Sequence, residues 1–146
     1  MKNLLLLLFC VFSLTLKAQE TTKEIVTATP DIELIVVEEQ PIFPGCEKVS
    51  KDERLNCFNQ KISEHIAKHL RYPREAARRN IQEKVFIAFI ITNEGKVEIQ
   101  NINCTFEGFK DEIKRIFKKL PLIIPGKQKG ENVNVHFMFP VNFKLR

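Results

Sequence analysis

Apolar and polar positions alternate most clearly between residues 84 and 104, where the pattern predicts a β-hairpin. In the first arm, Val85–Ile91, apolar side chains occupy both faces of the expected strand. A strand of this kind is covered on both sides or lies in the middle of a small sheet. Thr92–Gly95 interrupts the run with Asn and Gly, which tolerate the positive φ of a tight turn. Because an isolated hairpin is only marginally stable in water, the rest of the chain must cover it.

Three stretches have the spacing of amphipathic helices. The first begins near Leu55 and places an apolar residue at every fourth position up to Leu70. The second, Tyr72–Gln82, has Pro73 at a position that suits the start of a helix, and Asn80 can cap its end. The third helix, which Pro121 ends, has these apolar residues on one side: Phe109, Ile113, Ile116, Phe117 and Leu120.

The last part of the chain predicts one strand that begins near residue 132 and continues towards the C-terminus. Its apolar positions alternate with polar ones and begin with Val133, Val135, Phe137 and Phe139. Pro140 has no N–H to donate, so we expect this strand at the edge of a sheet or at a bulge. An edge strand leaves main-chain groups unpaired, and these groups can pair with an extended peptide.

The N-terminal residues 1–19 have the features of a secretory signal peptide. Lys2 precedes an apolar run, Leu4–Leu16, which is shorter than the roughly 20 residues of a transmembrane helix. Leu16 is larger than the residue that usually precedes a cleavage site, so an uncleaved signal anchor stays open. Cys10 is expected to leave with the leader. This interpretation places the protein in the periplasm and makes inner-membrane anchoring the less favoured alternative.

Residues 20–37 are expected to form a flexible tether followed by an extended segment. Glu20–Asp31 is polar and rich in Thr, whereas Ile32–Val37 is β-prone and is expected to pair with an edge of the sheet. Residues 38–146 are then expected to form a single domain.

The charge of the chain is only mildly positive, +5 over 146 residues. Without the leader it would be about +3, which is too small an excess to argue for nucleic-acid binding. The arginines of the second predicted helix, Arg74, Arg78 and Arg79, form either a solvated basic face or a surface for an acidic partner. Ser50 and Ser63 lie in no recognisable nucleophile motif, so we predict neither an enzyme nor a small-molecule substrate.

Two pairs of side chains are candidates for a bridge: a cysteine pair for a disulfide and a histidine pair for a metal ion. In an exported chain, Cys46 and Cys57 are expected to form a disulfide, with two independent buried thiols as the alternative. Cys104 is expected to be a buried thiol on a strand. His65 and His69 have the i, i+4 spacing of a metal pair, but no third ligand is evident. We therefore favour two surface histidines and predict no metal and no cofactor.

The order of several short motifs along the chain resembles that of the TonB C-terminal domain, in particular the versions found in Bacteroidetes-type bacteria. The resemblance covers roughly residues 38–146. The motifs are Phe43-Pro44-Gly45, Tyr72-Pro73-Arg74-Glu75-Ala76, Lys84-Val85, Asn93-Glu94-Gly95-Lys96-Val97, Leu120-Pro121, Pro125-Gly126-Lys127-Gln128 and Pro140-Val141-Asn142-Phe143-Lys144-Leu145.

The resemblance implies an α+β fold, in which a small antiparallel sheet is backed by two to three helices. It also implies a periplasmic module for energy-coupled transport, whose sheet edge pairs with the TonB-box peptide of an outer-membrane transporter. By this likeness Tyr72, Pro73 and Arg74 lie in the contact region, and the strand carrying Val133, Val135, Phe137 and Phe139 supplies the edge. Two alternatives stay open: an anchored energy transducer, if the leader is retained, and a structural protein that forms a homodimer through its exposed edges.

Overall fold

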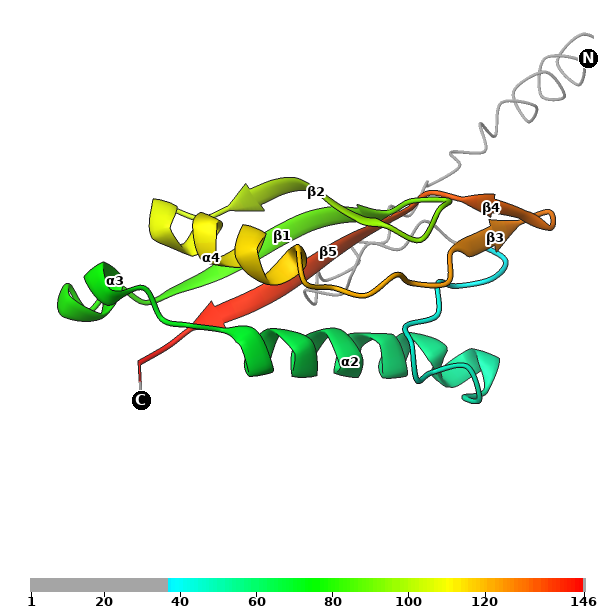
Figure 1. The fold of residues 1–146 in the computed structure, drawn as a ribbon, viewed down its shortest axis with the longest axis horizontal. Coiled ribbons are helices and arrows are strands. Elements are labelled where there is room, and N and C mark those ends of the chain that lie inside the picture. The colour runs from blue at the N-terminus through cyan, green and yellow to red at the C-terminus, as the bar shows by residue number, and fades with distance from the viewer. Residues whose placement is uncertain (1–36, 146) are drawn as a thin grey trace, which may run out of the picture.

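Strand β1 (Glu83–Ile91) lies in the middle of a three-stranded antiparallel sheet in the computed structural model, which describes residues 37–145 (Figure 1). Its neighbours are β2 (Val97–Asn103) and β5 (Val135–Phe143), so the strand order is β2-β1-β5. The apolar residues on both faces of β1 are therefore those of a central strand. The predicted signal peptide and nearly all of the predicted tether lie outside the described residues.

The turn of the β1–β2 hairpin forms where the sequence places it. The N–H of Thr92 donates to the carbonyl of Lys96 at 2.8 Å, and the N–H of Gly95 donates to the carbonyl of Thr92 at 2.8 Å. Gly95 has φ +83°, and a Cβ there would collide with the carbonyl oxygen of Ile123. Only glycine meets both requirements. Further along β2, the register shifts so that Gln100 forms a bulge.

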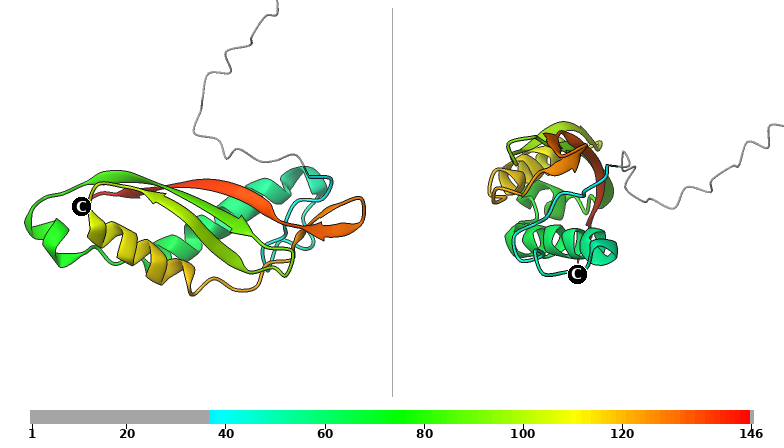
Figure 2. Two further views of the ribbon diagram at one scale, coloured as in Figure 1. Left: turned by 90° about the horizontal axis from the view of Figure 1, so that it is seen from above. Right: turned by 90° about the vertical axis from the view of Figure 1, so that its right-hand side faces the viewer.

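Two long helices cover one face of the sheet (Figure 2). Helix α2 (Arg54–His69) buries Phe58, Ile62 and Ile66, and helix α4 (Glu107–Phe117) buries its own apolar side. Both confirm the helical periods read from the sequence. The second predicted helix is shorter than expected: α3 spans only Arg74–Arg78, and the chain leaves it through Asn80 at φ +50°.

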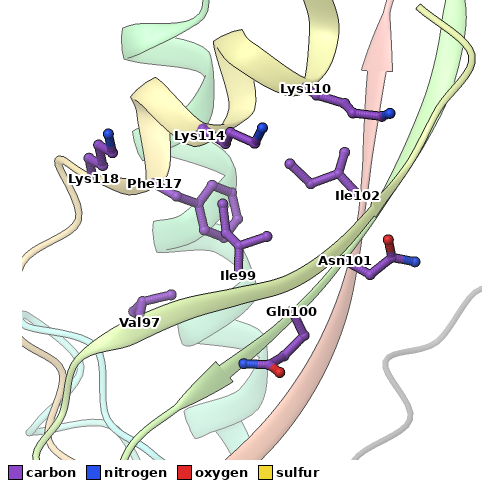
Figure 3. A pocket seen from close by; sticks show the side chains of 9 residues that line it. All are labelled: Val97, Ile99, Gln100, Asn101, Ile102, Lys110, Lys114, Phe117 and Lys118. Carbon is purple, nitrogen blue, oxygen red and sulfur yellow. The ribbon is translucent and has the colours of Figure 1, made fainter. Parts of the chain in front are cut away.

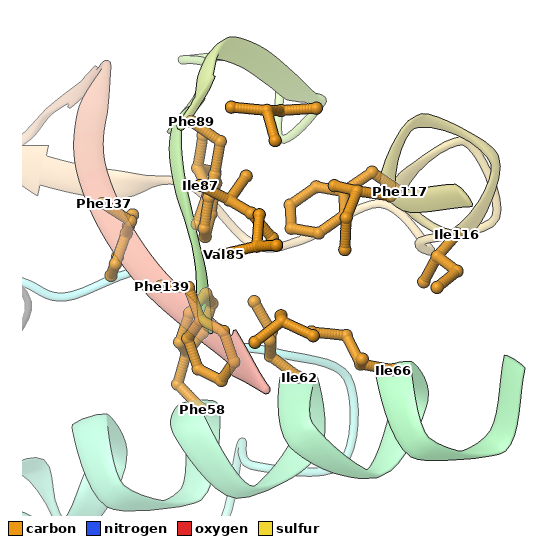
Figure 4. Close-up of a cluster of buried hydrophobic side chains, with 14 of the residues drawn as sticks. Phe58, Ile62, Ile66, Val85, Ile87, Phe89, Ile116, Phe117, Phe137 and Phe139 are labelled. Carbon is orange, nitrogen blue, oxygen red and sulfur yellow. The ribbon is translucent and has the colours of Figure 1, made fainter. Parts of the chain in front are cut away.

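The core between sheet and helices combines phenylalanine rings with Ile and Val side chains (Figure 4). Phe137 of β5 stacks on Phe58 of α2 at 4.8 Å and on Phe89 of β1 at 5.4 Å. At the other end of β5, Phe143 stacks on Phe109 of α4 at 4.0 Å. Strand β5 is therefore held by ring contacts to both long helices as well as by its ladder to β1.

A second, two-stranded sheet lies beyond the N-terminal end of β5. It consists of β3 (Gly126–Gln128) and β4 (Glu131–Val133), and bridges from Glu39 to Lys127 and from Ile42 to Ile124 join the chain before α2 to it. The described end of the extended segment predicted before residue 38 therefore lies next to the small sheet. The prediction of one strand from Val133 onward is wrong, because the chain divides between β4 and β5 at Asn134.

Hydrogen bonds explain this division. The side-chain oxygen of Asn134 accepts the N–H of Asn93 at 2.8 Å, and the amide of Asn132 donates to the carbonyl of Asn93 at 3.3 Å. The turn of the main hairpin thus contacts residues 132–134, where the chain passes from β4 to β5. Beyond it, β5 pairs with β1, whereas β4 pairs with β3.

The predicted disulfide between Cys46 and Cys57 is confirmed, with Cα atoms 6.0 Å apart. It joins the corner after Phe43 to the start of α2, and the loop that it closes contains the short 3-10 helix η1 (Lys51–Glu53). Closing a loop of this length stabilises the fold by about 2–3 kcal/mol. The prediction that Cys104 is a buried thiol on a strand is wrong: Cys104 directly follows β2, which ends at Asn103, and is a half-buried free thiol.

Candidate functional site

The outer edge of β5 is the candidate site, because β5 has a partner strand on one side only within residues 37–145. Along a strand, successive main-chain groups point in opposite directions. Since the N–H of Thr92 points towards β2, the main-chain groups of Ile91, Phe89 and Ile87 point towards β5. On β5, their partners Val135, Phe137 and Phe139 use their own groups for this ladder.

The alternate residues of β5 therefore direct their main-chain groups away from the sheet. These are His136, Met138, Pro140 and Asn142. Pro140 pairs in register with Phe86, so its missing N–H falls on the outward side and the ladder to β1 loses nothing. The prediction that Pro140 marks an edge strand is confirmed. A guest strand would find outward donors on both sides of Pro140 and an outward acceptor at Pro140 itself.

The four residues that the sequence predicts for the edge do not direct their side chains to the outer edge of β5. Val135, Phe137 and Phe139 are buried, at 0%, 3% and 9% exposure, because they face the helices. Met138 is 45% exposed on the opposite face of the sheet. Val133 lies in β4, outside the strand that forms the edge. The alternation of buried and exposed side chains is visible in the sequence of a strand. Which residues direct their main-chain groups outward depends on the hydrogen-bonding register with β1.

Tyr72 anchors the chain at the C-terminal end of β5. Its ring packs edge-on against Phe143 at 6.0 Å and against Phe109 at 5.8 Å, and its hydroxyl donates to the carbonyl of Ile81. Burial raises the pKa of the Tyr72 phenol, so the hydroxyl remains a donor at neutral pH. Pro73 immediately precedes α3, and Arg74, the first residue of α3, is exposed. The structure therefore brings the predicted contact segment to one end of the edge strand.

A half-buried ion pair, which no sequence pattern points to, holds the segment that leads to Tyr72. The carboxylate of Glu112 accepts from the guanidinium of Arg115 at 2.6 Å and 2.9 Å and from the N–H of Arg71 at 2.6 Å. Arg115 also donates to the carbonyl of His69, the last residue of α2. Burial favours the neutral carboxyl, but the hydrogen bonds from Arg115 and Arg71 prevail and lower the pKa of Glu112.

His65 and His69 do lie together, with ring centroids 4.6 Å apart. One nitrogen of His65 lies 3.2 Å from the carbonyl oxygen of Ile116. Desolvation and the neighbouring cations lower the pKa of His69. No group of three potential metal ligands occurs within residues 37–145. In the same range, no helix has both the length and the apolar character needed to cross a bilayer.

Comparison with known proteins supports one family. The family model described as "Gram-negative bacterial TonB protein C-terminal" matches residues 68–145, which is more than half of the chain. No curated protein matches the sequence. Among solved structures, the C-terminal domain of TonB from Helicobacter pylori matches with 25% identity and a TM-score of 0.44, over 68% of this chain and 87% of that one.

Proposed function

The chain belongs to the TonB C-terminal domain family, and on this premise we propose that the outer edge of β5 binds the TonB-box peptide of an outer-membrane transporter. Members of the family are non-catalytic interaction modules linked to energy-coupled transport. The proposal adds a partner, a site and a geometry: an extended peptide joins the sheet as a fourth strand beside β5. It also places the protein in the periplasm, where such peptides are accessible.

The observation that supports this proposal is the set of outward main-chain groups of β5 that have no partner strand within residues 37–145. His136, Met138 and Asn142 each present an N–H and a carbonyl, and Pro140 presents a carbonyl. Each hydrogen bond to a guest strand contributes a net of about 0.5–1.5 kcal/mol. The buried side chains of β5 need not move, because they are already packed against α2 and β1. Pairing therefore requires ordering of the peptide but no rearrangement of the core.

The segment from Tyr72 to Arg74 adds specificity at one end of the edge. Tyr72 contacts Phe143, and Arg74 follows it as an exposed cation at the start of α3. We propose that Arg74 contacts acidic groups of the transporter next to the peptide. Since exposed ion pairs contribute about 0–1 kcal/mol, Arg74 would affect the choice of partner more than the affinity.

A titration of the full chain with a TonB-box peptide tests the proposal, with amide signals followed by NMR. The informative variant is Met138→Pro, which removes an outward N–H but no hydrogen bond to β1. The native Pro140, two residues further along β5, already lacks its N–H in the same way. The matched control is Met138→Ala, which changes the same side chain and keeps the N–H. We expect Met138→Pro to weaken binding about tenfold and Met138→Ala to have little effect.

Two results would contradict the proposal: no shift of the β5 amides at saturating peptide, or equal binding by the two Met138 variants. The same edge could instead pair with a second copy of this chain. In that case the β5 amides would be protected at high protein concentration without any peptide. Sedimentation over a range of concentrations separates self-association from peptide binding.

A further inference from the structure

A groove follows the other edge of the sheet, between β2 and α4, and its volume is about 500 Å³. Its apolar part comes from Val97, Ile99, Ile102 and Phe117, and the lysines of α4 form the opposite wall (Figure 3). These lysines are Lys110 and Lys114 of α4 and Lys118, which directly follows it; they recur every four residues and so lie on one side of the helix. The groove combines apolar surface with positive charge.

The groove continues past the start of β2. A second hollow of about 300 Å³ shares Val97, Phe117 and Lys118 with the first and extends to Leu122. Leu122 is 67% exposed, the most exposed of the large apolar side chains in residues 37–145. The two hollows together follow β2 from Val97 to Ile102, and this elongated shape suits an extended segment better than a compact ligand.

The main chain of β2 can take part in binding at one half of this groove. No strand pairs with the outer side of β2 within the described part of the chain. Because the N–H of Thr92 donates to Lys96, the alternation along β2 directs the main-chain groups of Val97 and Ile99 away from β1. Gln100 then forms the bulge and interrupts the register. Regular pairing is therefore limited to residues 97–99.

The charge of the groove selects the kind of segment that can pair there. The ammonium of Lys110 forms an ion pair with the carboxylate of Glu107 at 2.8 Å. Lys114 and Lys118 form no ion pair with the residues that the structure describes. Glu98 borders the second hollow, next to Lys96 and Lys118. Lysines beside an edge strand discourage pairing with neutral or basic strands. The same lysines attract a strand that carries carboxylates.

We propose that this groove binds an extended acidic segment of a partner protein, in which the residues facing α4, every second one along the strand, include both apolar residues and Asp or Glu. The segment pairs with Val97 and Ile99, its apolar side chains contact Ile99 and Phe117, and its carboxylates contact Lys114 and Lys118. The site lies on the opposite edge of the sheet from β5 and does not depend on the function proposed above. One domain could then hold two extended segments at once.

The test uses the full chain and a peptide as long as β2, in which every second residue, on the side facing α4, is Val or Glu and the residues between are Thr. Amide hydrogen exchange is the readout. We expect new protection at Val97 and Ile99. The double variant Lys114→Gln/Lys118→Gln should weaken binding about threefold to tenfold, since two partly exposed ion pairs are lost. The matched control is Lys51→Gln/Lys68→Gln, which lowers the net charge equally on exposed lysines outside the groove and should bind like the unaltered chain.

Three results would overturn the proposal. The first is equal binding of the same peptide with Lys in place of each Glu, which would remove the role of charge. The second is protection confined to His136 and Met138, which would place the peptide on β5. The third is binding of anionic phosphatidylglycerol vesicles that Lys114→Gln/Lys118→Gln abolishes, with no protection of Val97 by the peptide. That result would assign the lysines to a membrane surface.

Discussion

The two edges of the main sheet face the same physical problem and differ in how they meet it. Both β5 and β2 leave main-chain groups without a partner strand in residues 37–145. Strand β5 keeps a regular register over nine residues, and its inner side chains are deeply buried. Strand β2 is shorter, is interrupted by a bulge and lies beside three lysines. Bulges and lysines protect an edge from unselective pairing.

Under the two proposals above, β5 would accept any compatible main chain on the side that has no partner in residues 37–145, whereas β2 would accept only a chain of suitable charge. On β5, Pro140 limits pairing with other strands, because it removes one outward donor without disturbing the ladder to β1. The comparison can be tested through the stability of each edge, the connection between them and the binding at each.

The largest expected effect concerns the packing beneath the two strands. Phe137→Ala should lower the free energy of unfolding by about 3–5 kcal/mol, because its ring stacks on both Phe58 and Phe89. Ile99→Ala should lower it by no more than about 2 kcal/mol, because Ile99 is only half-buried beside the groove. Equilibrium unfolding in urea measures both values. Equal losses would show that the two edges are packed alike.

The next effect concerns the ion pair that joins α4, beside β2, to the segment that leads to Tyr72, beside β5. The lowered pKa of Glu112 means that its contribution to stability is present above the usual glutamate pKa and is lost as the pH falls through the folded-state pKa. Between about pH 5 and pH 3, the unaltered chain should therefore lose more stability than Glu112→Gln.

Urea unfolding of both proteins at several pH values measures this difference. Glu75→Gln is a suitable control, because Glu75 forms only an exposed ion pair with Arg79 and its loss should leave the pH profile almost unchanged. Parallel profiles for Glu112→Gln and the unaltered chain would contradict the role given to Glu112.

A smaller effect is expected from Pro140→Ala, which restores an outward N–H on β5. Binding of the TonB-box peptide should become about threefold tighter, as one further hydrogen bond is available. Stability should change little, since the new N–H faces away from β1. Calorimetric titration measures the affinity, and a sedimentation run shows whether the restored donor also promotes self-pairing. Unchanged affinity would mean that the peptide does not reach residue 140.

The smallest effect is the difference in salt dependence between the two edges. Raising the ionic strength from about 0.05 M to about 0.5 M should weaken binding of the acidic peptide at β2, because exposed charges are screened. Main-chain pairing at β5 should respond less, and Arg74→Gln should remove most of the response that remains. Parallel titrations of the two peptides at each salt concentration provide the measurement.

Local patterns in the sequence determined the two longer helices, the central hairpin and its turn. The spacing of Phe58, Ile62 and Ile66 predicted α2, the run around Asn93 and Gly95 predicted the hairpin, and Pro140 predicted an edge strand. The pair Cys46–Cys57 was also predicted. These features depend on side-chain periodicity and on backbone preferences of Gly and Pro, which act within a few residues.

Only the tertiary structure decided which main-chain groups of β2 and β5 point away from the described sheet. The division of β4 from β5 depends on Asn132 and Asn134 meeting the turn at Asn93, about 40 residues away in the chain. The pairing of Arg71 with Glu112 and the groove between β2 and α4 likewise join distant segments. A strand sequence shows which side chains alternate, but the direction of its hydrogen bonds is set by the register with its neighbour, and that register follows from packing of the whole domain.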